Sequence, residues 1–293
     1  MPTTYLTTLS AFTHFLTAYI HNLLYLRHLY PLPSFLCTRF HNTPVYQSRH
    51  PDVCQWIKDA VAAVRDELLK GTVARIAIVV YHPGYDEGSG SVKILERYML
   101  DVSGFPVVTR EERFMDIEWE KSEKEKVEAE KRAAEEAAAA AAEVVGNKGK
   151  GKAKQKPEGL DADVDVNLSE QFRAAFITLT TRASQLEPLP PDCSFNISME
   201  LKDEADVDPP IGHPQKWVPS QPSLQKTGRK GAVLNDDEMH SRPEGEDLGG
   251  AKVTPIRTVE AGVFRFETWI EEGRAKFETH WPSQQSSLDS SAG

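Results

Sequence analysis

The chain has 293 residues and a formal net charge of −10 at pH 7, with 34 Lys and Arg against 44 Asp and Glu. A protein that grips duplex DNA through its phosphates is expected to carry a basic face, so this balance argues against sequence-specific nucleic-acid binding. The cysteines Cys37, Cys54 and Cys193 lack metal-ligand spacing. They are typical of reduced thiols in the cytosol or nucleus, with metal ligation as the less favoured alternative. We expect no metal and no cofactor.

The first helix is predicted by apolar residues that recur at steps of three or four: Phe12, Leu16, Tyr19, Leu23, Leu26 and Tyr30. We expect Pro31 to end this helix, because proline lacks the amide hydrogen and clashes with the preceding turn. Arg27 and three histidines interrupt the helix, and no run of about 18 apolar residues occurs. The sequence therefore predicts an intracellular, soluble protein with no membrane span.

A second helix and a β-hairpin are predicted next. Pro51 suits a first helical turn, and Gly71 suits a stop after Lys70. The β-branched run from Val73 to Tyr81 is typical of a strand. A glycine-containing turn at 82–91 and a second strand at 92–102 complete an antiparallel hairpin.

The middle of the chain changes in composition. Residues 118–145 are rich in Glu, Lys and Ala without an apolar stripe, which is typical of a solvated helix or a partly helical linker. Residues 146–159 alternate glycine and lysine and are expected to be disordered. The run from Lys148 to Lys156 is interpreted as a solvated linker, with a nuclear-import signal or a weak nucleic-acid contact as alternatives.

The remaining elements are a third helix at 167–185 and strands at 193–201, 253–259 and 263–270. This order predicts an α+β domain, with helices on one face of a mainly antiparallel sheet. About 170 residues carry recurrent apolar positions, near the usual size of one domain. The expected divisions are a first core part at 1–104, a charged insertion at 105–166, a second core part at 167–203, a C-terminal arm at 204–279 and a tail at 280–293.

Catalytic motifs are missing from the sequence. It has neither His-Glu-x-x-His nor Gly-x-Ser-x-Gly. The glycines between Gly84 and Gly90 follow a strand, but no Gly-Lys-Ser/Thr follows them, so a hairpin turn is favoured over a phosphate loop. No residue stands out as the centre of a catalytic mechanism, and we expect a protein that is not an enzyme.

Three blocks of the chain together resemble the HORMA-domain family, and within it the accessory subunits of translesion DNA polymerase zeta. The blocks are residues 23–31 with 42–57, residues 76–81 with 170–177 and 190–195, and residues 216–218 with 253–258 and 269–272. The tyrosine–proline helix end at Pro31 also occurs in spindle-checkpoint members. The Pro-Val and His-Pro block near Pro51 and the run from Trp269 to Glu272 favour the polymerase subunits.

The resemblance implies three helices on a sheet, with residues 204–279 forming a C-terminal "safety belt" that wraps around a partner peptide. The peptide would pair as an added strand, for which main-chain hydrogen bonds give affinity and side-chain pockets give selectivity. By resemblance, Trp56 and Trp217 contact this peptide, which would belong to the catalytic subunit of DNA polymerase zeta. The less favoured reading makes both tryptophans ordinary core residues.

Two further sites are implied by the same resemblance. Val253, Glu267 and Trp269 match positions that bind the C-terminal domain of a second polymerase, the deoxycytidyl transferase scaffold. The family has an amide and a tyrosine at the last two positions, so the contact would be altered here. Arg173, or Ala174 if the alignment slips by one residue, matches a dimer-interface arginine for a homodimer or a HORMA heterodimer.

These residues imply a non-enzymatic adaptor of DNA damage tolerance, located in the nucleus, with the cytoplasm as a further location. The alternative is a HORMA signalling protein of the spindle checkpoint or the meiotic axis.

Overall fold

The computed structural model describes residues 4–83, 92–115, 117, 166–202, 217, 250–261 and 263–278. The linker predicted at 118–145, the disordered run predicted at 146–159 and the tail at 280–293 lie outside the described residues. So do the glycine turn at 84–91 and the irregular part of the belt, except for Trp217.

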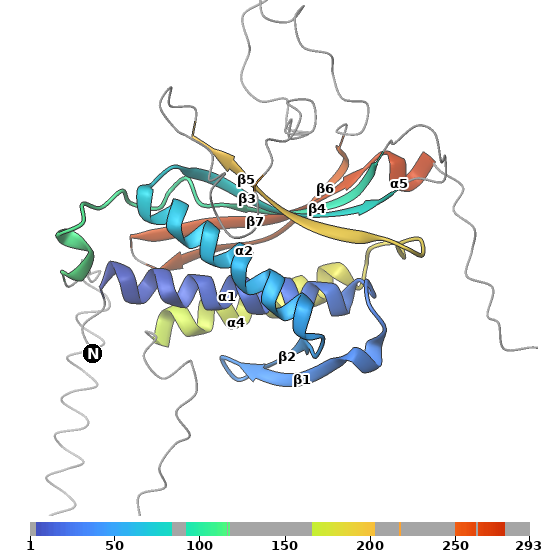
Figure 1. Cartoon of the computed structure of the whole chain (residues 1–293), viewed down its shortest axis with the longest axis horizontal. Coiled ribbons are helices and arrows are strands. Elements are labelled where there is room, and N and C mark those ends of the chain that lie inside the picture. The colour runs from blue at the N-terminus through green and yellow to red at the C-terminus, as the bar shows by residue number, and fades with distance from the viewer. Residues whose placement is uncertain are drawn as a thin grey trace, which may run out of the picture.

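One antiparallel sheet of five strands carries the fold, in the order β5-β3-β4-β7-β6. The strands are β3 (Val73–His82), β4 (Lys93–Asp101), β5 (Ser194–Leu201), β6 (Gly250–Ala261) and β7 (Phe264–Gly273). Three helices cover one face of the sheet: α1 (Tyr5–Leu26), α2 (Pro51–Lys70) and α4 (Val166–Ala183) (Figure 1). A short helix, α5 (Ala275–Glu278), follows β7, and single turns of 3-10 helix lie at Leu32–Ser34 and Glu112–Phe114. This arrangement confirms the predicted α+β class.

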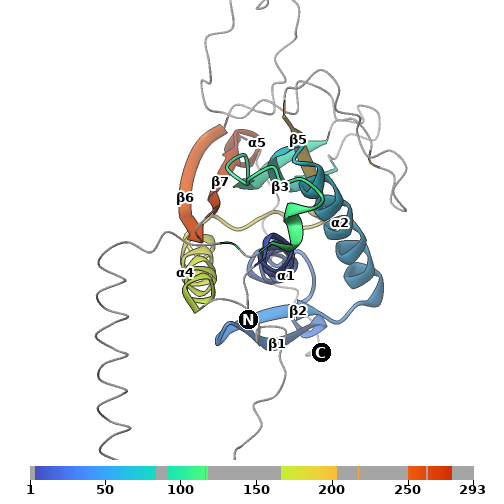
Figure 2. The same cartoon turned by 90° about the vertical axis from the view of Figure 1, so that its left-hand side faces the viewer.

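Helix α1 is the centre of the core. It lies between the sheet on one side and a small hairpin on the other, with α2 and α4 flanking it (Figure 2). The ring of Phe15 stacks on Phe172 of α4, with centroids 4.5 Å apart, and meets Phe266 of β7 at 5.6 Å. Thr4 and Thr7 form a reciprocal capping box that satisfies the first amides of the helix. Helix α1, which carries the predicted apolar stripe, is therefore buried on nearly all sides.

The end of α1 differs from the prediction. The helix stops at Leu26, before Pro31. Its C-cap is Arg27, and the following His28 has φ +54°, in the left-handed region. The amide of His28 donates to Tyr25 O at 3.1 Å, and the amide of Leu29 donates to Leu24 O at 3.1 Å. This pair of bonds is a Schellman motif, which closes a helix without a proline. The chain is then free to turn before the proline segment.

The structure contains a hairpin that the sequence patterns did not predict. Its strands are β1 (Phe35–Phe40) and β2 (Thr43–Ser48), joined by His41 and Asn42. Both linking residues have positive φ, at 45° and 58°, which fits the two-residue turn that matches strand twist. The pattern was missed because four successive residues of β1 are exposed and Pro44 lies inside β2.

Side chains of α1 hold the inner edge of β2. The amide of Tyr46 donates to Asn22 Oδ1 at 3.1 Å, and the amide of Ser48 donates to His21 Nδ1 at 3.4 Å. His21 must be neutral to accept this bond, and it is only 4 % exposed. Burial lowers the pKa of His21 from 6.5 to about 4. The hairpin is thus attached to a histidine that resists protonation.

The depressed pKa of His21 predicts a loss of stability at acid pH. Above pH 6.5 a histidine with a lowered pKa in the folded state is neutral in both the folded and the unfolded state, so it does not change the free energy of unfolding. As pH falls from 6.5 to 4, it binds a proton in the unfolded state first, which progressively destabilises the fold. The free energy of unfolding should fall by about 3 kcal/mol over this window from His21 alone. Urea titrations at pH 7 and pH 4 should show a smaller fall for His21→Gln, whose amide oxygen can accept the same bond. The exposed His50→Gln is the control, and an equal fall in both variants would contradict the assignment.

Candidate peptide-binding edge and its charged support

Strand β5 forms one edge of the sheet. Among the described residues it pairs only with β3, in an antiparallel register that sets Phe195 opposite Val80. Alternate N–H and C=O groups along its other edge therefore have no strand to bind. Such an edge is the kind of surface to which an extended peptide adds as a further strand.

Aromatic rings lie against this edge strand from two other elements. Trp56 of α2 meets Phe195 of β5 edge to face, with ring centroids 5.1 Å apart. Tyr30, in the turn after α1, meets the same Phe195 at 6.4 Å. Trp56 is half-buried, so part of the indole remains accessible beside the strand. The arrangement offers a rigid apolar wall next to main-chain hydrogen-bonding groups.

Helix α2 sets the position of Trp56. Pro51 begins the helix, where its missing amide hydrogen costs nothing. Gly71 ends it with φ +77°, and its amide binds the carbonyls of Glu67 and Leu68. Ile57 and Val64 are fully buried on the inner face of the helix. These contacts fix the helix rotation, and with it the side of the helix from which the indole projects.

Trp217 packs on the same hydrophobic core and is half-buried. Its Nε1–H is buried and has no hydrogen-bond partner in the described part of the chain. A buried indole N–H without an acceptor costs free energy, and a carbonyl of an added strand could accept from it. The two tryptophans predicted for the peptide site thus share one core, while their common role in peptide binding stays a prediction.

The chain that contains Trp217 connects opposite edges of the sheet. It leaves β5 at one edge after Leu201 and enters β6 at the other edge at Gly250. Four inter-strand spacings separate these edges, or roughly 19 Å at about 4.8 Å each. This topology leaves the edge of β5 unoccupied by the strand that follows it in sequence.

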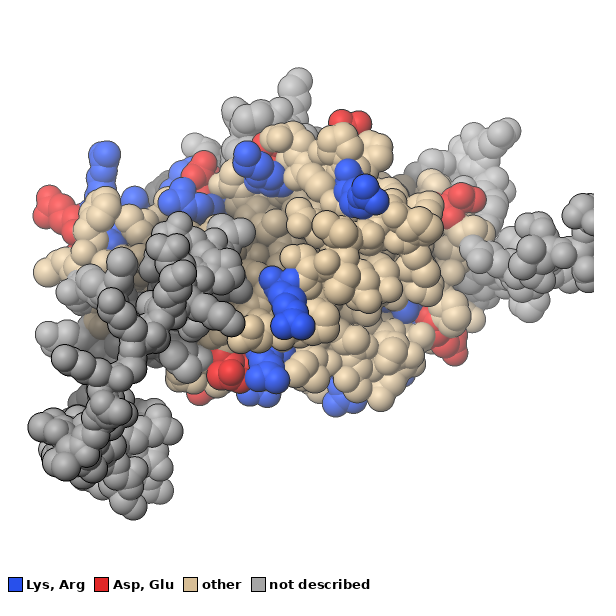
Figure 3. Space-filling view, turned by 90° about the horizontal axis from the view of Figure 1, so that it is seen from below, with Lys and Arg blue, Asp and Glu red and all other residues tan. Residues whose placement is uncertain are grey.

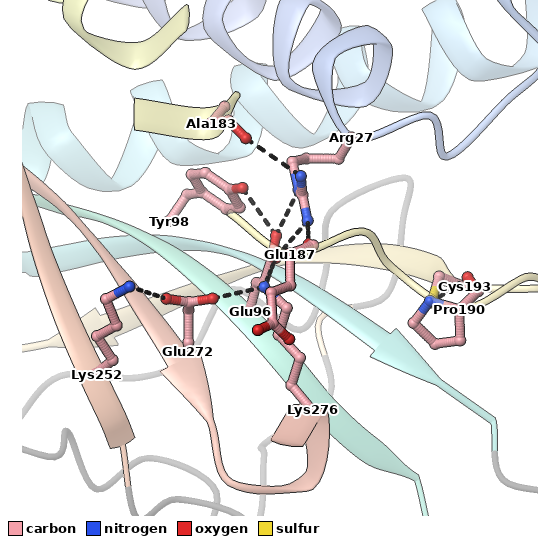
Figure 4. A network of polar contacts seen from close by, with 10 residues as sticks. All are labelled: Arg27, Glu96, Tyr98, Ala183, Glu187, Pro190, Cys193, Lys252, Glu272 and Lys276. Atoms are coloured by element: carbon pink, nitrogen blue, oxygen red, sulfur yellow. Dashed lines mark hydrogen bonds and ion pairs between the residues drawn. The ribbon is translucent and has the colours of Figure 1, made fainter. Parts of the chain in front are cut away.

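A buried network of charges holds the C-terminal elements β7 and α5 to β4 (Figure 4). Glu96 of β4 accepts two bonds from Arg27, at 2.9 Å from Nε and 2.7 Å from Nη2. It also accepts from the hydroxyl of Tyr98 at 2.8 Å and from Lys276 Nζ at 2.6 Å. Lys276 in turn donates to Glu272 of β7 at 2.6 Å. We call these five residues the Glu96 network.

The network also fixes the end of α4. Arg27 Nη1 donates to Ala183 O at 3.3 Å, and Nη2 donates to Glu187 O at 2.6 Å. Burial opposes the charge of Arg27, but Glu96 outweighs it and raises the pKa of the guanidinium. Burial, reinforced by Glu96, raises the pKa of Tyr98 well above its usual value. The four charges of Arg27, Glu96, Glu272 and Lys276 balance, which makes their burial possible.

The sequence offered little sign of this network. Arg27 stood out only as a charge within an apolar helix, and Glu272 only as part of a matched run. Nothing near Lys276 or Glu96 indicated that their side chains would meet, since 180 residues separate them. A buried position for Glu96, 0 % exposed within a strand, could have been suspected from its apolar neighbours.

The residues predicted to bind a second polymerase lie together on the outer face of the hairpin β6–β7. Val253 is opposite Glu271, and Glu267, Trp269 and Glu271 alternate along β7, so all four share the face turned away from the helices. Val253 is 44 % exposed and the side chain of Glu267 is 43 % exposed. These two residues are available to a partner.

Trp269 differs from its neighbours in being buried, at 4 % exposure. It packs with Ala77 and Met99, and its Nε1–H donates to Glu271 Oε1 at 2.8 Å. Glu271 also pairs with Arg97 at 2.7 Å. In this arrangement Trp269 supports the outer face from within. Of the three residues predicted to bind a second partner, Val253 and Glu267 are therefore the exposed ones, and their contact with that partner stays a prediction.

The residues predicted for a dimer interface lie on α4. The side chain of Arg173 is 47 % exposed and pairs with Glu170 at 3.5 Å, while Ala174 is half-buried. Ile177, one turn further on, is 51 % exposed. The structure therefore places Arg173 on the surface of α4, and its role in a dimer stays a prediction.

No cluster of three potential ligands, from His, Cys, Asp or Glu, occurs in the part of the chain that the structure describes. None of the described helices has the length and apolar character that crossing a membrane requires.

Comparison with known families decides the identity of the fold. Residues 9–235 match the HORMA domain. The chain belongs to the HORMA-domain family. A chain in the crystal structure of the Mitotic Checkpoint Complex superposes with a TM-score of 0.52 over 90 % of this chain and 98 % of its own length. The two are 14 % identical, so this likeness concerns the fold alone.

Curated HORMA relatives match a part of the chain. The DNA polymerase zeta processivity subunit of Schizosaccharomyces pombe is 35 % identical over 97 residues, which cover 33 % of this chain and 42 % of the relative. The human mitotic spindle assembly checkpoint protein MAD2B is 35 % identical over 66 residues, which cover 22 % of this chain and 31 % of that protein. The matches thus span less than half the length of either relative.

The Glu96 network predicts that the hairpin β6–β7 depends on Lys276 for its stability. Replacing Lys276 by Met removes a cation that is 2 % exposed and leaves Glu272 with only Lys252 at 3.7 Å. The free energy of unfolding should fall by about 3 kcal/mol, because a buried carboxylate loses its partner. Hydrogen exchange in β6 and β7 should accelerate more than exchange in β3.

Lys252→Met is the matched control, because Lys252 faces the same Glu272 but its side chain is 61 % exposed. This change should cost less than about 1 kcal/mol. Equal losses in the two lysine variants would show that Lys276 does not hold the hairpin.

Proposed function

We propose that this HORMA protein is a non-catalytic adaptor that captures an extended peptide against strand β5. The observation that carries the proposal is the edge of β5 beside Trp56, which pairs with no described strand on its outer side, while β6 of the C-terminal hairpin forms the opposite edge of the sheet. A peptide added at this edge would gain main-chain hydrogen bonds, and the indole of Trp56 would bury its apolar side chains.

The chain between β5 and β6 would act as the safety belt over this peptide. Its ends are attached to β5 and β6, at opposite edges of the sheet, and it would loop around the captured strand. Trp217 lies in this segment and would donate its free Nε1–H to the peptide. The Glu96 network would keep the belt closed by fixing the hairpin at its far end.

We propose the catalytic subunit of DNA polymerase zeta as the source of the peptide. The support is the likeness to the DNA polymerase zeta processivity subunit. The exposed Val253 and Glu267 would bind the deoxycytidyl transferase scaffold polymerase on the outer face of β6–β7. The two faces would let the adaptor bridge both polymerases in the nucleus during DNA damage tolerance.

A signalling role in the spindle checkpoint is the second candidate. The relatives named mitotic spindle assembly checkpoint protein MAD2B favour it. Under either function, peptides of checkpoint partners and of polymerase zeta would compete for the same edge of β5. Their relative affinities therefore distinguish the adaptor function from the signalling function. An interface at Arg173 of α4 would serve a homodimer or a HORMA heterodimer under both.

Joint replacement of Trp56 and Trp217 by Ala tests the peptide site. Binding of a proline-containing peptide from the catalytic subunit of polymerase zeta should weaken by at least about thirtyfold, because anchoring aromatic residues each contribute about 2 kcal/mol or more. Isothermal titration calorimetry on the full chain gives the affinity. Lys58→Ala changes an exposed residue of α2, the helix that contains Trp56, and should leave the peptide affinity unchanged.

Misfolding is separated from loss of contact by binding of the scaffold polymerase, which should survive in the tryptophan variant. Unchanged peptide affinity would remove both tryptophans from the site. Tighter binding of a checkpoint peptide than of the polymerase peptide would instead favour the signalling role.

Val253→Glu with Glu267→Arg tests the outer face of the hairpin. Both side chains are exposed, so the sheet should remain intact, whereas Trp269→Ala would leave a cavity. We expect the C-terminal domain of the scaffold polymerase to bind about tenfold more weakly, with peptide affinity unchanged. Surface plasmon resonance measures both, and Glu111→Gln, an exposed change that also raises the net charge by one, controls for altered net charge. Parallel loss of both partners would contradict the separation of the two sites.

A further inference from the structure

The hairpin β1–β2 has one protected edge and one open edge. On the inner edge, the amides of Tyr46 and Ser48 donate to Asn22 and His21 of α1. Edge strands expose unpaired main-chain groups, and proteins commonly cover such an edge with another element. Helix α1 covers β2 in this way. No described residue pairs with the outer edge of β1.

The register of the hairpin shows which groups the outer edge presents. Tyr46 and Ser48 direct their amides toward α1, and the amide of Arg49 donates to Ser34 O at 2.8 Å. Antiparallel pairs alternate between bonded and non-bonded positions. Cys37 and Arg39 are opposite Tyr46 and Pro44, at non-bonded positions, so their N–H and C=O groups point outward. Two successive docking positions for an extended strand result.

The side chains along β1 are also free of the core. Leu36, Cys37, Thr38 and Arg39 are exposed in succession, and Leu36 is 58 % exposed. Main-chain access to the outer edge is thus accompanied by access to the side chains on both faces of the ribbon. A strand docked there could use an apolar contact at Leu36.

Charge around the hairpin has a single sign. Arg39 and Arg49 are exposed, and neither forms an ion pair with the described residues. The first 51 residues contain no Asp or Glu at all, in a chain whose formal charge is −10. On neighbouring elements, Asp52 lies in the first turn of α2, and Glu170 of α4 pairs with Arg173. In Figure 3 the lower face is mainly uncharged, with a few separate Lys and Arg side chains across it and Asp and Glu toward its margin.

We propose that the outer edge of β1 docks an acidic segment of a partner protein as a third strand of the hairpin. The two outward-facing positions at Cys37 and Arg39 supply the main-chain bonds. Arg39 lies near one end of the edge, and Arg49 follows the residue paired with Phe35 at the other end. Arg39 would pair with a carboxylate of the docked strand, and Arg49, which follows β2, adds positive charge at the other end of the hairpin.

The docking site on the outer edge of β1 differs in position and chemistry from the peptide site at β5. The hairpin lies on the opposite side of α1 from the main sheet (Figure 2). Aromatic rings line the edge of β5, whereas arginines flank the edge of β1. A partner bound at β1 can therefore be present together with a peptide bound at β5. The proposal stands independently of the proposed capture function.

Fluorescence anisotropy with the full chain tests the proposal under reducing conditions. The probe is a labelled eight-residue peptide that alternates Val or Thr with Glu, and its comparison has Gln in place of each Glu. We expect the Glu peptide to bind at least tenfold more tightly, with an affinity that falls as salt rises. Equal binding of both peptides, or no binding of the Glu peptide, would overturn the proposal.

Two pairs of variants assign the contacts. Cys37→Pro removes an outward amide at a position where an edge strand accepts proline, and Cys37→Ser keeps that amide. We expect at least tenfold weaker binding for the proline variant and no change for the serine variant. Arg39→Glu with Arg49→Glu should abolish measurable binding, whereas Lys58→Glu on α2 should not. Circular dichroism melts verify folding.

Three other outcomes would overturn the assignment. Unchanged affinity in both Cys37→Pro and the double arginine variant would place the peptide elsewhere. If the polymerase zeta peptide proposed to bind at β5 displaced the labelled Glu peptide at a matching concentration, the labelled peptide would occupy the β5 edge. Concentration-dependent self-association that Cys37→Pro abolishes, without binding of the Glu probe, would make a second copy of the chain the occupant.

Discussion

The carboxylate of Glu96 is the point on which the arrangement of this HORMA domain depends. It lies fully buried on β4 and binds Arg27 at the end of α1 and Lys276 of α5, while Arg27 reaches the last carbonyls of α4. Burying such a charge is unfavourable unless every partner is in place. The end of α1, the end of α4 and the C-terminal hairpin must therefore be assembled together, which couples four elements that are distant in sequence.

This coupling has a consequence for the peptide edge. Lys276 and Glu272 hold β7 beside β4, so the C-terminal hairpin forms one edge of the sheet, and no described strand pairs with the outer side of β5 at the other. The aromatic wall of Trp56 and Phe195 lies beside that uncovered strand. An open edge in a folded protein is an aggregation hazard unless it is used or protected. Capture of a peptide, as proposed, would turn this hazard into a binding site.

The two proposed docking edges, on β5 and β1, illustrate different ways of selecting a strand. Beside β5, rings that are already fixed by the core supply apolar area with few rotors to freeze. Beside β1, Arg39 and Arg49 supply charge, and the covered edge of β2 directs any addition to the outer side. Both edges offer the same main-chain groups, so the side chains around them decide which peptide binds.

The sequence by itself determined the helices and strands whose apolar spacing is local and strong: α2 and the strands β3 and β4 closely, α1 and α4 with different ends. It could not give the hairpin β1–β2, because exposed residues on β1 and Pro44 on β2 mask the alternation that marks a strand. Only the tertiary structure decided that Trp269 is buried, that α1 ends at Leu26 and that Glu96 meets Lys276. The burial of Trp269 and the contact of Glu96 with Lys276 depend on residues far apart in the chain, and the end of α1 depends on the Schellman bonds of His28 and Leu29; no apolar periodicity records any of them.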